Sequence, residues 1–166
     1  MGSGKTLSMV KYAYEYYQKG YKIYSNIKLN FPYTEYSFQD LIDYANDDKT
    51  FYNSVILCDE MHITLDSRNS GSKRNRVITY FLLQTRKKDV KLFYTTQFFH
   101  QVDKRLRSNT DYVIMNNTRK TIKGTTYTMN LFVQTTELGR QLKKTVIYRS
   151  QPYYKLYNTY EVVKMV

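Results

Sequence analysis

The stretch Gly2-Ser3-Gly4-Lys5-Thr6 decides the fold against which the rest of the sequence is interpreted. It matches the second half of the G-x-x-x-x-G-K-[ST] phosphate-binding loop. In such a loop glycines let backbone N–H groups approach the phosphates, and the following helix adds a favourable dipole. Lys5 would contact the β- and γ-phosphates, and the Thr6 hydroxyl would bind Mg²⁺. Two other interpretations stay open: a myristoylation signal with Gly2 as acceptor, and a plain Gly-Ser lead-in.

The residues after this loop predict a helix and then a strand. Apolar side chains recur in steps of three and four over residues 5–19, and Gly20 supplies a C-terminal stop. Residues 21–29 are expected to be extended, and residues 38–44 to form a short helix with Ser37 as its cap. The helix that directly follows the loop is what a phosphate site requires.

A second acidic element follows an apolar run. Residues 55–58 read Val-Ile-Leu-Cys, which is typical of a buried parallel strand, and Asp59 and Glu60 come next. Asp59 would hold the Mg²⁺ shell through water, and Glu60 would orient or deprotonate the attacking water. Taken alone, such an acidic pair can equally belong to a loop or a cap. Cys58 and His62 are interpreted as structural, because one cysteine and one nearby histidine do not make a metal site.

A third element lies near residue 97. A helix is expected to end near Lys88, and a β-rich run follows over residues 90–96. Gln97 at the end of that run would reach the γ-phosphate or the attacking water, or it is a hydrogen-bonded turn residue. Arg86 would enter the site of a neighbouring subunit as an arginine finger. Its simpler interpretation is a cation favoured at a helix C-terminus.

The alternation of elements predicts an α/β fold with a mainly parallel sheet flanked by helices. Apolar and polar residues alternate over residues 127–133, and residues 144–148 form another β-rich run. These runs predict antiparallel strands added at an edge. We expect one domain over residues 1–166, with an ATPase core at 1–117 and a β-rich extension at 118–166.

Charge is distributed unevenly along the chain. The net charge of +12 is −3 over residues 1–67, +9 over 68–107 and +6 over the remainder. This asymmetry favours a surface that binds a polyanion, with an ordinary basic surface as the alternative. The single cysteine fits a reducing compartment, and neither a membrane span nor a signal peptide is expected. The candidate nucleic-acid contacts are Arg68, Lys73, Arg74, Arg76, Lys104, Arg105 and Arg107.

Together these residues resemble the FtsK–HerA superfamily of P-loop ATPases. The likeness is greatest to its viral genome-packaging ATPases and its Zot-like filamentous-phage assembly proteins. It covers residues 1–117 well and rests on four stretches: residues 2–6, 55–60, 84–97 and 102–111.

The resemblance implies specific roles and partners. Gly2, Ser3, Gly4, Lys5 and Thr6 would bind ATP and, with Asp59, Mg²⁺. Glu60 would be the catalytic carboxylate, Gln97 a polar sensor and Arg86 the trans-acting arginine, and Arg107 matches a second recurrent arginine. Family members form ring oligomers, usually hexamers, that thread DNA. The expected partners are therefore DNA, further copies of the chain and a virion or portal-like component, in the host cytoplasm.

One departure from the family pattern concerns the start of the chain. Family members place a β-strand and the first glycine of the loop before the position of Gly2. We therefore expect an upstream translation start, a fragment, or another segment in that position. The primary hypothesis is a DNA-packaging motor. The alternatives are a Zot-like assembly and extrusion ATPase and a non-hydrolysing nucleic-acid-binding module. A nucleotide kinase is disfavoured because no arginine-rich lid segment follows Gln97.

Overall fold

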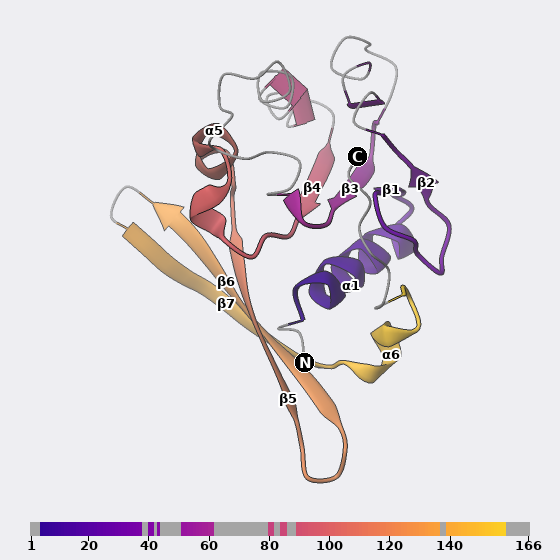
Figure 1. Ribbon diagram of the computed structural model, residues 1–166, viewed down its shortest axis with the longest axis vertical. Helices are drawn as coiled ribbons and strands as arrows, with labels where there is room; N and C mark the ends of the chain where they lie inside the picture. Colours follow the sequence, from indigo (N-terminus) through magenta and orange to yellow (C-terminus); the bar gives the residue numbers. More distant parts are fainter. Residues whose placement is uncertain are drawn as a thin grey trace.

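A parallel sheet and an antiparallel sheet lie on either side of one long helix (Figure 1). The structure is a computed structural model that describes residues 4–37, 40–41, 43, 51–61, 80–81, 84–85, 89–136 and 139–158. The expected α/β class is confirmed, with a parallel sheet followed by antiparallel strands.

The parallel sheet holds four strands in the order β2-β1-β3-β4. Its strands are β1 (Lys22–Ser25), β2 (Thr34–Glu35), β3 (Ser54–Cys58) and β4 (Val90–Tyr94). Every residue of β3 is buried, as its apolar run predicted, because β1 and β4 flank it and both faces are covered. The sequence predicted β1, β3 and β4 but made β1 and β4 too long, since they end at Ser25 and Tyr94. Strand β2 was not predicted.

Helix α1 (Lys5–Gln18) confirms the helix predicted after the loop. Its apolar face, with Val10 and Ala13 fully buried, packs in one core with Val55 and Leu57 of β3. The short helix α6 (Gln151–Tyr154) lies beside α1, and the chain after it pairs with the segment between β1 and β2 through a bridge between Tyr157 and Leu29. This side of the sheet carries the loop that begins α1.

The opposite face of the parallel sheet packs against a second core. Ile56 and Cys58 of β3 point to this side and pack with Phe81, Val102 and other buried side chains. The chain here forms the 3₁₀ turn η3 (Phe99–Gln101) and helix α5 (Lys104–Ser108). Residues 80–81 and 84–85 are helical, in agreement with the helix predicted to end near Lys88.

The short helix predicted at residues 38–44 is confirmed where the structure describes it. Residues 40, 41 and 43 are helical. The Ser37 hydroxyl accepts from the Asp40 N–H at 3.2 Å, while the Asp40 carboxylate accepts from the Ser37 N–H. These reciprocal bonds cap the helix.

Strands β5 (Val113–Lys120), β6 (Thr126–Thr136) and β7 (Gly139–Arg149) form a separate antiparallel sheet, which we call the ribbon. The prediction that the antiparallel strands extend an edge of the parallel sheet was wrong. Strand β5 pairs along its whole length with β6 and therefore belongs to the ribbon. No described helix is long and apolar enough to cross a bilayer.

Strand β4 has one open edge among the described residues. Its pairing partner is β3, and its other side faces a groove of about 700 Å³ between α1 and the ribbon. Four of its five residues are only partly buried, in contrast to β3. The edge lies beside the start of α1, since residues of both line the groove.

Candidate active site

Gly4 forms the turn into α1 and meets two separate constraints. Its φ of +84° lies in the left-handed region that L side chains avoid. A Cβ built on it would lie 2.5 Å from Thr118 Oγ1 of the ribbon. The turn leaves the first N–H groups of a 14-residue helix facing outward, where an anion is favoured.

Asp59 lies at the end of β3, directly opposite the start of α1. Its carboxylate accepts a hydrogen bond from the Thr6 hydroxyl, 3.1 Å away at Oδ1 and 3.3 Å away at Oδ2. It also accepts from Thr95 Oγ1, which follows β4, at 2.6 Å. Asn26, after β1, clamps the Asp59 backbone with bonds of 2.9 and 3.1 Å. Three neighbouring strand ends therefore hold one carboxylate in place.

The environment of Asp59 favours a bound cation. Its side chain is almost fully buried, and this burial raises the pKa of the carboxyl above its ordinary value. The hydrogen bonds from Thr95 and Thr6 oppose that shift, and the charge of Lys5 opposes it least. A buried carboxylate next to a hydroxyl oxygen is a donor pair that suits Mg²⁺.

This donor set suits Mg²⁺ better than it suits a metal ion that is coordinated entirely by protein side chains. Within the described ranges no three His, Cys, Asp or Glu side chains gather into a metal site. Mg²⁺ commonly takes one or two carboxylates and completes its shell with water and substrate phosphates. Thr6 and Asp59 would hold it here.

Glu60 adopts a backbone conformation that is unusual for its residue type. Its φ is +56°, and its N–H donates to Thr95 Oγ1 at 3.0 Å. Left-handed conformations of residues other than glycine cost of order 1–3 kcal/mol and cluster at functional sites. The turn aims the Glu60 side chain toward Gln97, whose Nε2 donates to Oε1 at 3.4 Å.

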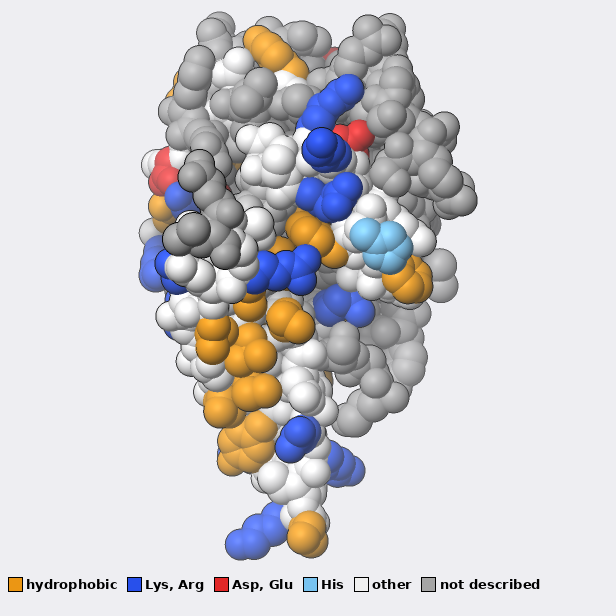
Figure 2. Space-filling view, turned by 90° about the vertical axis from the view of Figure 1, so that its left-hand side faces the viewer, with side chains coloured by type: hydrophobic (Ala, Val, Ile, Leu, Met, Phe, Trp, Pro, Cys, Tyr) orange, Lys and Arg blue, Asp and Glu red, His pale blue; other side chains and the backbone are white. Residues whose placement is uncertain are grey.

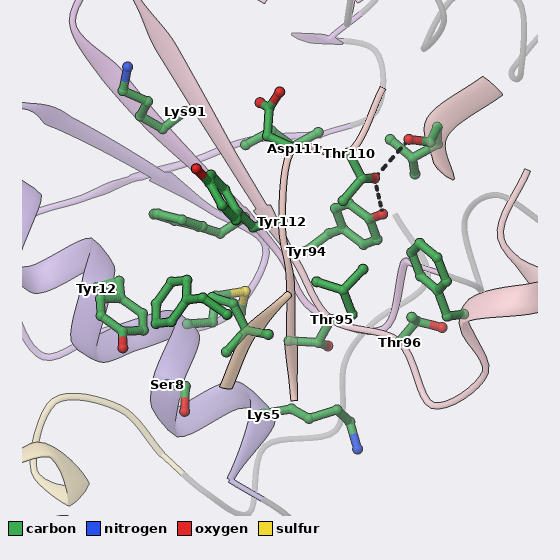
Figure 3. A pocket seen from close by; sticks show the side chains of 18 of the residues that line it. Lys5, Ser8, Tyr12, Lys91, Tyr94, Thr95, Thr96, Thr110, Asp111 and Tyr112 are labelled. Carbon is green, nitrogen blue, oxygen red and sulfur yellow. Dashed lines mark hydrogen bonds between the residues drawn. The ribbon is translucent and has the colours of Figure 1, made fainter. Parts of the chain in front are cut away.

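The structure therefore brings together most of the predicted residues that it describes. Gly4, Lys5 and Thr6 start α1, Asp59 and Glu60 end β3, and Gln97 follows β4. Figure 3 shows Lys5 at the start of α1, close to Thr95 and Thr96 in the same groove. The predicted residues outside the described part are Gly2, Ser3, Arg68, Lys73, Arg74, Arg76 and Arg86.

The predicted basic residues on α5 differ in exposure. Lys104 and Arg105 are exposed, whereas Arg107 is half-buried and donates from Nε to the Val102 carbonyl at 2.9 Å. Asp103 caps this helix by accepting from the Arg105 N–H at 2.8 Å. Lys104 and Arg105 are thus available to an external anion, and Arg107 also stabilises its own turn.

Sequence reasoning missed Thr95 and Asn26. Thr95 links the Asp59 carboxylate to the Glu60 backbone, and Asn26 fixes the Asp59 backbone. Thr95 lies in the run that ends at Gln97, so its place at a strand end was a usable signal. Nothing in the residues around Asn26 indicates that it pairs with a position 33 residues later.

Comparisons with known proteins show the family and the fold of this chain. The sequence matches the zonular occludens toxin (Zot) family over residues 1–164. The fold is similar to the crystal structure of the N-terminal domain of zonular occludens toxin from Neisseria meningitidis. The TM-score is 0.63 at 21% identity, over 95% of this chain and 94% of that one.

A second similar fold comes from an archaeon. The flagellar accessory protein FlaH from Methanocaldococcus jannaschii has a TM-score of 0.55 at 13% identity, over 89% of this chain and 80% of that one. No curated protein matches the chain.

Proposed function

We propose that this chain, which belongs to the zonular occludens toxin family, is a P-loop ATP hydrolase that drives the movement of DNA. The observation that carries the proposal is the contact between Thr6 at the start of α1 and Asp59 at the end of β3. These residues lie 53 positions apart in the sequence, and their contact supports the proposal that the loop and the end of the acidic strand form one nucleotide site.

The hydrolysis chemistry assigns a role to each described residue. The N–H groups at the start of α1 and the Lys5 ammonium would stabilise negative charge on the β- and γ-phosphates. Water would attack the γ-phosphorus, the bond from that phosphorus to the bridging oxygen would break, and Glu60 would accept the proton that water loses. Gln97, which contacts Glu60, would orient the water or sense the γ-phosphate. Mg²⁺ at Thr6 and Asp59 would neutralise phosphate charge.

DNA is the proposed cargo because of the charge distribution. Residues 68–107 carry a net charge of +9, and Lys104 and Arg105 of this stretch are exposed. Neutralising phosphates with Lys and Arg supplies most of the affinity of proteins for nucleic acid. A ring of identical subunits, with Arg86 acting across each interface, is part of the same proposal.

Two processes would use such an ATPase: the assembly of a filamentous virus and the packaging of a viral genome. Family membership favours the first. The match over residues 1–164 supports a Zot-like ATPase that assembles and extrudes a filamentous virus. A genome-packaging motor would use the same nucleotide site, and it remains the second candidate. The two processes differ in the fate of the DNA. In packaging, DNA enters a preformed shell; in filament assembly, DNA leaves in the assembling filament.

Glu60→Gln tests the hydrolytic role. We expect ATP turnover to fall at least ~100-fold while nucleotide affinity is kept, because the amide cannot accept the proton. Glu15→Gln, on α1 and paired with Lys11, is the matched control and should hydrolyse ATP normally. Turnover and binding of a fluorescent nucleotide would be measured with and without DNA. Normal hydrolysis by Glu60→Gln would refute the assigned role, and binding without any turnover in the native chain would favour the non-hydrolysing module.

A further inference from the structure

The ribbon buries polar side chains and exposes apolar ones. On β6, Thr126, Thr128 and Asn130 face α1 and are buried. Asn130 Nδ2 donates to the Ser8 hydroxyl on α1 at 2.8 Å, and Thr128 pairs with Ser150. The alternate residues of β6 therefore point to the outer face, away from α1, since successive strand side chains face opposite sides.

This outer face is largely apolar across all three strands. Pairing places Met115 opposite Leu131, and Ile147 opposite Met129. Met115 is 55% exposed, Leu142 59% and Ile147 65%. Figure 2 shows hydrophobic side chains gathered in a band over this part of the molecule. The apolar members of the outer face are Val113, Met115, Tyr127, Met129, Leu131, Val133, Leu142 and Ile147.

Arginines border this apolar face, and carboxylates are absent from it among the described residues. In the strand register, Arg119 of β5 and Arg149 of β7 lie opposite Tyr127 at one end of β6. Arg140 of β7 lies opposite Thr135 at the other end. Residues 112–136 and 139–158 contain no Asp or Glu. An apolar centre with methionine, tyrosine and arginine is the composition of a protein–protein interface. A phosphate backbone would use the arginines and leave the aliphatic side chains without a role.

The same chain carries a surface of opposite charge. Residues 35–48 contain five carboxylates and no Lys or Arg. Glu35 on β2, Asp40 and Asp43 are all exposed, and hydrogen bonds from Ser37 lower the pKa of Asp40. Strand β2 lies at the edge of the molecule opposite the ribbon (Figure 1).

We propose that the outer face of the ribbon docks on the β2 edge of a second copy of this chain. The two surfaces differ, so the contact is head-to-tail and repeats from copy to copy, closing into a ring if the rotation allows. The proposal rests on the homo-oligomer of the proposed function and specifies the surfaces that form it. The apolar face supplies buried area, and the arginines select the acidic edge.

A pair of matched variants tests the apolar face. Ile147→Glu should weaken self-association about a hundredfold, because a carboxylate would be buried in an apolar contact. Ile122→Glu is the control: Ile122 is fully exposed in the turn between β5 and β6, off the outer face. Sedimentation over a range of concentrations, with Mg²⁺ and ATP present, would measure self-association, and circular dichroism would confirm that both variants fold.

A charge exchange tests the choice of partner surface. The double variants Arg119→Glu/Arg149→Glu and Glu35→Arg/Asp43→Arg should each lose self-association, and an equimolar mixture should regain a ribbon-to-edge contact. Recovery in the mixture cannot arise from misfolded subunits. Failure of the mixture to associate would overturn the assignment of the β2 edge, and a native chain that stays monomeric would overturn the proposal.

Two further outcomes distinguish this inference from its alternatives. If Ile147→Glu assembles normally but loses binding to vesicles of phosphatidylcholine and phosphatidylserine, the outer face binds lipid and the proposal is wrong. If the native chain assembles and the charge exchange succeeds while no ATP is hydrolysed, the proposed function fails and this inference stands.

Discussion

At the scale of single residues, Gly4 joins the turn before α1 to the ribbon. Gly4→Ala should destabilise the fold by about 1–2 kcal/mol from its positive φ, with a further loss from contact with Thr118. Gly20→Ala is the matched control, because Gly20 has a φ of +88° and open space where a Cβ would lie. Adding Thr118→Ala should recover part of the loss at Gly4 and none at Gly20. Equal losses of free energy of unfolding for the two glycines would contradict the predicted clash.

Asp59 should make stability depend on pH. Its pKa is raised in the folded chain, so the fold favours the protonated carboxyl and loses stability as pH rises from the ordinary value through the raised one. The Asp59→Asn variant does not titrate there. Its free energy of unfolding relative to the native chain should therefore increase across that window and then level off.

Asp89 is the control, because its pKa shift, and therefore its effect on the pH dependence of stability, has the opposite sign to that of Asp59. Bonds from Lys91 and then Tyr21 lower the pKa of Asp89, so its contribution is present above the ordinary pKa and is lost as pH falls through the lowered one. Urea titrations of Asp59→Asn and Asp89→Asn from pH 3 to pH 8 would measure both effects. Parallel pH profiles for the two variants would show that the sign at Asp59 is wrong.

At the scale of elements, β3 places Cys58 where reagents do not reach it. The thiol is buried beside Tyr36 and Met61, and burial raises its pKa to about 12. Alkylation by iodoacetamide at pH 8 should be at least about 1,000-fold slower than in the urea-unfolded chain, since thiolate and access are both lacking. Mass spectrometry over time would measure the rate. Rapid labelling of the folded chain would show that the sheet opens at β3.

The elements also show what the sequence could predict. The apolar steps of α1 and the uniform run of β3 each specify one structure, and both were correct. Alternation on β6 predicted a strand, but period two does not tell which face is buried, and the polar face is the buried one. Of the site, the sequence found the residues that carry charge. The position of Thr95 at a predicted strand end was a usable signal, whereas the link through Asn26 depends on strand order, which no local pattern reveals.

At the scale of the whole molecule, the uneven distribution of positive charge should appear in the salt dependence of DNA affinity. Lys104→Ala/Arg105→Ala should reduce the slope of log affinity against log salt by about 2, because each phosphate contact contributes about 1. Lys22→Ala/Lys155→Ala removes two exposed cations at other places and should leave the slope unchanged. Fluorescence anisotropy of a labelled oligonucleotide from 50 to 300 mM salt would measure both. An equal drop in the two variants would mean that binding follows net charge alone.

The contact between the glycine turn and the ribbon has a mechanical consequence. Gly4 lies against Thr118 and Thr128 of the ribbon. Ser8 forms hydrogen bonds with Asn130 and Tyr148. The start of α1 therefore packs directly on the ribbon. From Thr128 to the end of β6 at Thr136 the strand extends about 27 Å, at 3.4 Å per residue. If the start of α1 tilted by about 5° at the proposed phosphate site, that far end would move by about 2 Å, which is the size of helix shift that occurs at subunit interfaces in switching proteins. The proposed nucleotide site and the far end of β6 would therefore be coupled mechanically through the contact at Gly4.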